Sequence, residues 1–493
     1  MMEDLKGKAV RGGFVTILGQ AAKVMLRMGS LILLARILTP KEFGLVGMVT
    51  AITGVLEIMK DAGLSAVTVQ RARITNEEIS TLFWVNILVG LILGVLTLAI
   101  APVLVIFYHE PRLLWVTMAL ASGFLFNAAG VQHTALLQRR LRFFALAITE
   151  IISLAVSISV GIGMAIGDCG YWSLVGMAVA QPAAYAACVW LATRWIPGKP
   201  QRNIGMRSML KFGGTVTLNT FIVYIAYNIE KVLLGRFWGA EALGTYGRAY
   251  QLITFPTGLL NSAVGTVAFP ALSRLQDDPP RFKNYFLKGY SLVLAMTIPI
   301  TLACALFADD IILVLLGPQW NNSIIIFRLL APTVLIFALI NPLGWLLFST
   351  GRVGRSLKIA LVLAPLVIVA YVTGLPYGPR GVAFAFSAMM TLWFVPHIAW
   401  AIHGTSISLR DIFRTASRPF LAGIATGALS YGMRLLYGQL LSPFLRLVLG
   451  GGIMLVLYLW ILLYIMGQKS FYYDIFLRLK MRSSVDDKEM ERG

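Results

Sequence analysis

Long apolar stretches alternate with short polar connectors along the whole chain, and no ten-residue alternating pattern of the kind found in membrane β-barrels recurs. Most stretches exceed 18 residues, a length that favours a membrane-spanning helix over a buried core helix. We count fourteen, at about residues 13–37, 43–69, 80–107, 113–137, 144–167, 171–193, 209–235, 243–272, 287–308, 324–349, 356–375, 380–403, 419–437 and 443–466. The pattern predicts an all-α polytopic membrane protein of about fourteen transmembrane helices.

Composition and charge support this class of protein and indicate its orientation. Of the 493 residues, 58% are hydrophobic and 13% are charged, whereas about 25% are charged in soluble domains. A net charge of +20 would suggest a nucleic-acid partner for a soluble protein. Here the connectors and tails on the side of the two termini hold 29 Lys and Arg residues, and those on the other side hold 7. This bias predicts that both termini are cytoplasmic and that the basicity reflects topology, with no nucleic-acid partner.

The cysteines, the histidines and the N-terminus suggest no further chemistry. The three Cys and four His residues show no spacing typical of a metal or redox site, so we expect neither a metal nor a cofactor. No small-residue cleavage site follows the polar N-terminus, and the first apolar stretch is therefore interpreted as a permanent span. No connector is long enough to hold a soluble domain, so we expect function to depend on the helices and their ends.

The second half of the chain repeats features of the first half at an offset of 200 residues. The segments 33–47 and 233–247 each cover a span, a turn and the start of the next span. Five positions match, namely Leu33, Leu34, Arg36, Gly44 and Gly47 with Leu233, Leu234, Arg236, Gly244 and Gly247. Six spans per repeat would make the two halves parallel, related by an axis along the membrane normal. We predict two pseudo-symmetric six-helix bundles, at 1–200 and 201–403, followed by two additional helices and a cytoplasmic tail at 404–493.

Ionisable residues within the spans are the candidates for function, because charge inside a membrane is costly. They are Lys23, Arg27, Glu57, Lys60, Asp61, Glu150, Glu230, Lys231, Arg248 and Arg328. Lys23 and Arg27 share a helix face near mid-depth, and no acid lies within one turn of either. At the repeat-related positions stand Val223 and Tyr227, so these charges break the symmetry, as a ligand site would. An anion such as a phosphate or diphosphate would suit both cations.

For other members of this set the sequence leaves alternatives open. Lys60 either contributes to the same anion site or neutralises Glu57 or Asp61 on its own helix. Arg248 and Arg328 lie near the predicted outer ends of their spans, so they either line a cavity or extend to the membrane interface.

Several short motifs, in this order along nearly the whole chain, resemble the polysaccharide-transport family of the multidrug/oligosaccharidyl-lipid/polysaccharide (MOP) exporter superfamily. Within this family the chain is most similar to Wzx-type flippases of the colanic-acid and xanthan kind. The motifs are LARIL at 34–38 with Phe43 and Gly44, DAGL at 61–64 with VQR at 69–71, TLFWVN at 81–86, LLQRR at 136–140 with Phe143 and Glu150, FG at 212–213, LLGRF at 233–237, GAEALG at 239–244, YGRAY at 246–250, FPALSRLQDD at 269–278 and LGPQW at 316–320.

The resemblance implies a MOP- or MATE-like transporter of the bacterial inner membrane rather than an enzyme. Its cargo would be a polyprenyl-diphosphate-linked oligosaccharide, flipped by alternating access for exopolysaccharide or lipopolysaccharide synthesis, with other polysaccharide assembly proteins as further candidate partners. We expect a cationic cavity to bind this substrate, lined by Lys23, Arg27, Lys60, Arg248 and Arg328. Ion coupling or charge pairing would involve Glu57, Asp61, Glu150, Glu230 and Lys231.

Two other functions are weighed against this one. A cation-coupled drug or small-molecule antiporter of the same superfamily would favour buried acids, whereas Lys23 and Arg27 are basic; Glu57, Asp61 and Glu150 keep this alternative open. A membrane glycan polymerase or ligase commonly carries its catalytic groups on a sizeable periplasmic loop. The chain has no such loop and no convincing acid–base or nucleophile arrangement, which makes an enzyme the weakest of the three.

Overall fold

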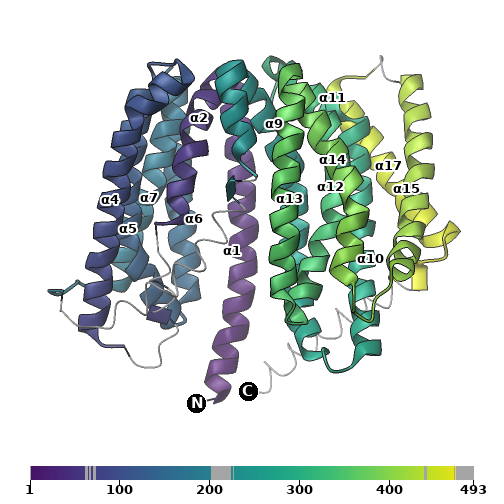
Figure 1. Cartoon of the computed structure of the whole chain (residues 1–493), viewed down its shortest axis with the longest axis horizontal. Helices are drawn as coiled ribbons and strands as arrows, with labels where there is room; N and C mark the ends of the chain where they lie inside the picture. Colours follow the sequence, from purple (N-terminus) through teal and green to yellow (C-terminus); the bar gives the residue numbers. More distant parts are fainter. Residues whose placement is uncertain are drawn as a thin grey trace. The chain divides into compact units, whose positions relative to one another are not determined.

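The described secondary structure of the chain is helical throughout, as the computed structural model in Figure 1 shows. The structure describes residues 2–60, 74–200, 227–437 and 441–470 together with residues 65, 68, 69, 224, 225 and 472. Its internal contacts divide the chain into unit 1, Met1–Gly244, and unit 2, Thr245–Gly493. Each unit has buried apolar clusters of its own.

Unit 1 is a helical bundle. Its described helices are α1 (Met2–Ile37), α2 (Pro40–Ile58), α4 (Asn76–Tyr108), α5 (Leu113–Arg139), α6 (Phe143–Ile166), α7 (Trp172–Thr193) and the first part of α9 (Ile229–Arg274). Helix α5 packs against α4 and α7, and α6 packs against α7 and α1. Capping boxes begin two of these helices, with Thr39 and Glu42 at α2 and Thr75 and Glu78 at α4. Such boxes satisfy backbone N–H groups that have no partner within the helix, so the local sequence fixes where these helices begin.

Two glycines at repeat-related positions allow α2 and α9 to approach each other backbone to backbone. A Cβ atom on Gly44 would collide with the carbonyl of Ala240, and one on Gly244 would collide with the carbonyl of Pro40. Pro40 and Ala240 are themselves 200 residues apart, as are Gly44 and Gly244. The contact is therefore reciprocal, as it is when a two-fold axis relates two equivalent segments. It supports the internal repeat at this point of the chain.

At residues 236–242, where the sequence predicts a connector, two helices meet at Gly239. Helix α9 runs from Ile229 to Arg274 and departs from helical geometry at Gly239, with φ 81° and ψ −177°. Glycine adopts positive φ at little cost, so the first helix can end and the second begin at this one residue. The break thus falls within the connector predicted between the two spans. Most of the first of these two spans, residues 209–223, lies outside the described residues.

Unit 2 contains the rest of α9 and a series of helices that share one apolar core. They are α10 (Pro279–Leu306), α11 (Ala308–Leu315), η1 (Pro318–Trp320), α12 (Asn321–Ser349), α13 (Val353–Gly374), η2 (Leu375–Tyr377), α14 (Gly378–Ile402), α15 (Leu409–Tyr437), α16 (Pro443–Leu445), η3 (Arg446–Gly450), α17 (Gly451–Trp460) and η4 (Ile461–Ile465). Buried side chains of this core come from α10, α12, α14 and α17, for example Tyr290, Leu346, Ile398 and Tyr458. The C-terminal helices therefore pack into unit 2.

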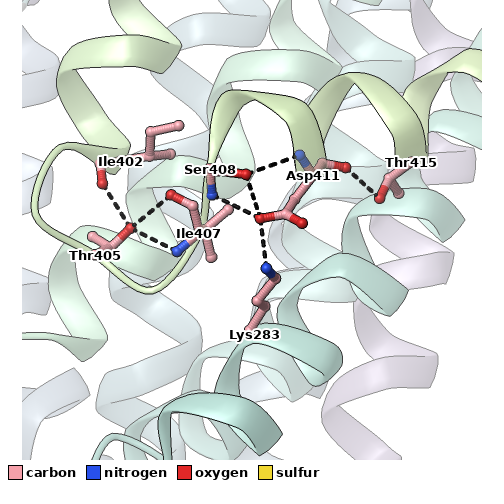
Figure 2. Close-up of polar contacts among 7 residues, drawn as sticks. All are labelled: Lys283, Ile402, Thr405, Ile407, Ser408, Asp411 and Thr415. Atoms are coloured by element: carbon pink, nitrogen blue, oxygen red, sulfur yellow. Dashed lines mark hydrogen bonds and ion pairs between the residues drawn. The ribbon is translucent and has the colours of Figure 1, made fainter.

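Polar contacts fix the first turn of α15 to α10, as Figure 2 shows. The backbone N–H of Asp411 donates to the Ser408 hydroxyl, and that hydroxyl donates to the Asp411 carboxylate at 2.7 Å. Lys283 of α10 forms an ion pair of 2.6 Å with the same carboxylate. Hydrogen bonds from Lys283 and from Ser408 lower the pKa of Asp411 to about 2. Just before this turn, the backbone N–H of Ile407 donates to the Thr405 hydroxyl at 3.2 Å.

A second charged cluster fixes the last turn of α15 to α11. Arg434 of α15 forms an ion pair of 2.7 Å with Asp309, and Arg446 of η3 forms one of 2.9 Å with Asp310. The carboxylate of Asp310 is fully buried. Because α15 is held near both of its ends by other elements of unit 2, we treat the C-terminal helices as part of that unit.

Nine helical segments among the described residues are long and apolar enough to cross a membrane. The chain is therefore a multi-pass helical membrane protein, which confirms the predicted class. The predicted count of about fourteen spans and the predicted boundaries near residues 200 and 403 remain predictions.

Candidate functional site

Three of the five cations expected to bind substrate line one cavity of unit 1. Lys23 and Arg27 come from α1, and Lys60 comes from the residues just after α2. The cavity has a volume of about 450 Å³ and is also lined by Glu57 and Glu150. The structure thus gathers charged side chains from α1, from the end of α2 and from α6 around one space.

Lys23 forms an ion pair with Glu150 of α6, which lies 127 residues further along the chain. Helix α1 packs along α6, and this brings the two residues together. The Lys23 side chain is 16% exposed and that of Glu150 is 39% exposed, so the pair is only partly shielded from the cavity. Charge pairing is one of the two roles that the sequence predicts for Glu150, and in the structure its counter-charge is Lys23. The binding of an external anion by Lys23 stays a prediction.

Arg27 and Lys60 have no ion-pair partner among the described residues that surround them. The alternative in which Glu57 neutralises Lys60 on the same helix is therefore not observed; α2 ends at Ile58, before Lys60. Asp61, the other partner considered for Lys60, lies outside the described residues. Within the described part of the chain, no group of His, Cys, Asp and Glu side chains could hold a metal ion.

A second cavity, of about 480 Å³, adjoins the first at Glu57, which lines both. Lys231 lines this second cavity and donates to the side-chain oxygen of Asn228 at 2.6 Å. The preceding residue, Glu230, is 1% exposed, and its carboxylate oxygens have no hydrogen-bond partner within the described chain. Glu230 and Lys231, predicted as a charge pair or as ion-coupling groups, thus lie in different surroundings. Of the two, only Lys231 lines this cavity.

The other two candidate cations belong to unit 2. Arg248 in α9 donates to the side chain of Gln251, one turn further on. Arg328 in α12 forms an ion pair of 2.7 Å with Asp309 in α11. Their role at a substrate site stays a prediction.

Comparison with known proteins identifies the family. Residues 33–325 match the family model described as "Polysaccharide biosynthesis protein". The chain belongs to this family. The teichuronic acid biosynthesis protein TuaB of Bacillus subtilis (strain 168) is 27% identical over 396 residues, which cover 77% of this chain and 79% of TuaB. The lipopolysaccharide biosynthesis protein WzxC of Escherichia coli (strain K12) is 25% identical over 446 residues, covering 89% of this chain and 90% of WzxC.

The fold of this polysaccharide biosynthesis protein is also found among solved transporters. The lipid II flippase MurJ, in an inward closed conformation, matches with a TM-score of 0.74 and 15% sequence identity, covering 91% of this chain and 99% of MurJ. Transporters of the MOP superfamily share the fold as well. The expected MOP-type fold is therefore confirmed; at this identity the likeness concerns the fold alone.

Neutral polar side chains of this polysaccharide biosynthesis protein complete the first cavity. They are Asn127 of α5, Ser153 of α6, and Gln181 and Tyr185 of α7. Our sequence-based predictions considered charged groups alone and missed all four. For Asn127 and Gln181 a signal was present, since each places an amide in the middle of an apolar span, where a polar group without a partner is costly.

Proposed function

We propose that this protein moves polyprenyl-diphosphate-linked oligosaccharide repeat units from the cytoplasmic to the periplasmic leaflet of a bacterial inner membrane, for synthesis of an extracellular polysaccharide. The observation that carries the proposal is the cationic cavity of unit 1, lined by Lys23, Arg27 and Lys60. The family match supports it, as do relatives named for teichuronic acid and lipopolysaccharide biosynthesis. MurJ, whose fold the chain shares, is named as a lipid II flippase.

The charges of the cavity suit a diphosphate. An arginine such as Arg27 can donate two parallel hydrogen bonds to phosphate oxygens, and lysines such as Lys23 and Lys60 add point charges. These three cations outnumber the two carboxylates of the same lining, Glu57 and Glu150. The cavity would thus replace the water that a diphosphate loses when it leaves the membrane surface, while the polyprenyl tail stays in lipid. Alternating access would then expose the cavity to one side at a time.

The driving force in this proposal is an ion gradient or the membrane potential, with Glu57 and Glu150 as the candidate coupling groups of the first cavity. Asp61 and Glu230 are further candidates.

A cation-coupled drug antiporter is the second function we keep, because acids do line the cavity. The ion pair between Lys23 and Glu150 disfavours it, since a neutralised carboxylate attracts an organic cation only weakly.

The membrane arrangement is also part of the proposal. The excess of Lys and Arg in connectors on the side of the termini supports a cytoplasmic location of both ends. The protein would act as a transporter and not as an enzyme, with the lipid-linked oligosaccharide as its partner and other polysaccharide assembly proteins as further candidates.

Deletion of the gene tests the proposed function. We expect lipid-linked oligosaccharide to accumulate on the cytoplasmic leaflet and export of the polysaccharide to stop, with both effects reversed by the wild-type chain. The K23Q/R27Q double variant should insert normally and fail to restore export. Normal export in the deletion strain, or full restoration by the double variant at equal abundance, would contradict the proposal.

A further inference from the structure

The first cavity of unit 1 is lined by two chemically different sets of side chains. Its cations, Lys23, Arg27 and Lys60, come from α1 and from the residues after α2. Its amides, Asn127 and Gln181, come from α5 and α7. A diphosphate accounts for the first set and leaves the second set without a function.

The two amides are available to a ligand. Asn127 lies near the middle of α5 (Leu113–Arg139), and Gln181 lies near the middle of α7 (Trp172–Thr193). Neither side chain has a hydrogen-bond partner among the described residues, and both line the cavity. An amide costs free energy at this depth unless it forms hydrogen bonds. Because no described side chain or backbone group occupies these two amides, a ligand that displaces water from the cavity can bind both.

Two hydroxyl groups beside the amides can act as acceptors. The Thr134 hydroxyl lies 2.9 Å from the Gly130 carbonyl and 3.1 Å from the Tyr185 hydroxyl. When Thr134 donates to Gly130, the Tyr185 hydroxyl is the donor to Thr134. The Ser153 hydroxyl donates to the Glu150 carbonyl at 3.0 Å. With their hydrogens engaged, the oxygens of Tyr185 and Ser153 retain lone pairs that can accept hydrogen bonds.

A proline adds a backbone acceptor to the same wall. Pro182 lies inside α7 and has no N–H group to donate to the carbonyl of Ala178, one turn earlier. Ala178 and Pro182 both line the cavity. The helix therefore leaves one carbonyl without its usual donor next to the Gln181 amide.

We infer that Asn127 and Gln181, together with the acceptor oxygens of Tyr185, Ser153 and Ala178, form a carbohydrate subsite for the sugar attached to the diphosphate. This inference rests on the proposed function. Sugar hydroxyls both donate and accept hydrogen bonds, and amides provide both partners. The acceptor oxygens favour hydroxyl groups over phosphate oxygens, which only accept. The substrate would therefore bind with its diphosphate toward α1 and its first sugar toward α5 and α7.

The test compares two probes on the purified full chain: undecaprenyl diphosphate without sugar, and the lipid-linked oligosaccharide extracted from cells that lack the transporter. In the N127L/Q181M double variant we expect about tenfold weaker binding of the sugar-bearing probe. Binding of the sugar-free probe should stay within about twofold of wild type, which also shows that the variant is folded. The single variants N127L and Q181M should each show part of the effect. As a matched control, N86L removes a buried amide of α4 that does not line the cavity, and it should bind both probes as wild type does.

The outcomes separate the subsite from the proposed function. Equal weakening of both probes in the double variant would assign Asn127 and Gln181 a structural role and overturn the subsite. Unchanged binding of both probes would overturn it as well. If the wild-type chain binds neither probe, the proposed function fails and the subsite fails with it.

Discussion

Lys23 has two candidate anionic partners, the Glu150 carboxylate observed in the structure and the diphosphate of the proposed substrate. Ion pairs that remain partly exposed contribute little to stability, typically below about 1 kcal/mol. The pair can therefore open at low cost when a stronger anion enters. Glu150 would thus keep Lys23 neutralised in the absence of substrate and compete with the substrate for it.

This competition predicts effects of opposite sign at the two residues. Replacing Lys23 by Gln should weaken binding of undecaprenyl diphosphate about tenfold, because one charge-assisted contact is lost. Replacing Glu150 by Gln should tighten binding several-fold, because Lys23 no longer has a competing partner. Equilibrium binding to the purified variants measures both. Weaker binding in both variants would show that the ion pair itself is needed to shape the site.

Arg27 has no ion-pair partner among the described residues and should bind phosphate directly. The R27Q variant loses charge-assisted hydrogen bonds worth about 1.5–3 kcal/mol, so we expect polysaccharide export to fall roughly tenfold or more at equal abundance. The K199Q variant makes the same change of charge in the exposed connector after α7 and serves as the control. Equal export by R27Q and K199Q would remove Arg27 from the binding site.

At the scale of residues, the sequence allowed the charged residues of the cavity to be predicted, but not the residues that contact them. Lys23, Arg27 and Lys60 were predicted from their cost inside the membrane, and they line one cavity. The contact of Lys23 with Glu150 could not be predicted, because it joins positions 127 residues apart and depends on how α1 packs on α6. The amides of Asn127 and Gln181 were missed because the search for intramembrane site residues considered ionisable side chains only.

At the scale of helices, the reciprocal contact of α2 with the part of α9 just after Gly239 brings two backbones together. It depends on glycine at two repeat-related positions, Gly44 and Gly244. The repeat was visible in the sequence as matching residues at an offset of 200, but their role in packing was not. The connector predicted at residues 236–242 coincides with the break in helical geometry at Gly239.

The reciprocal contact predicts equal sensitivity at its two glycines. The variants G44A and G244A should each lower the free energy of unfolding by about 1–3 kcal/mol, because the new methyl group meets backbone that cannot move aside easily. Gly247 is helical and has open space around it, so G247A should be neutral or slightly stabilising. Thermal unfolding in detergent compares the three. A G44A variant as stable as G247A would contradict the close approach.

The attachment of α15 to α10 predicts a specific pH dependence. The pKa of Asp411 is lowered to about 2 in the folded protein, whereas an aspartate in an unfolded chain has a pKa of about 3.9. The contribution to stability is therefore fully present above about pH 4 and is lost as the pH falls toward 2. We expect D411N to be less stable than wild type at pH 7, by less than about 1 kcal/mol because the pair is partly exposed.

This difference in thermal stability between D411N and wild type should persist from pH 5 to pH 8 and shrink below about pH 4. The D277N variant, which changes an exposed aspartate of the connector between α9 and α10, is the control and should match wild type throughout. A difference between D411N and wild type that grows as the pH falls would contradict the ion pair with Lys283.

At the scale of the whole molecule, the separation of charge across the membrane leads to a prediction about topology. Reporter fusions at residue 1 and residue 493 should both report the cytoplasm, and a fusion at Arg112 or Arg380 should report the periplasm. The sequence allowed this prediction because apolar length and the bias of Lys and Arg are local properties. The arrangement of charges within a cavity is not local, and it required the folded chain.

The cationic cavity of unit 1 is proposed to carry the diphosphate across the membrane, and this is the central claim. The most direct test reconstitutes the purified protein into liposomes that hold lipid-linked oligosaccharide, and follows the loss of sugar to an added, membrane-impermeant glycosidase. We predict that the wild-type chain makes the pool of the inner leaflet accessible, whereas the K23Q/R27Q variant leaves that pool protected. Equal rates for the two proteins would contradict the claim.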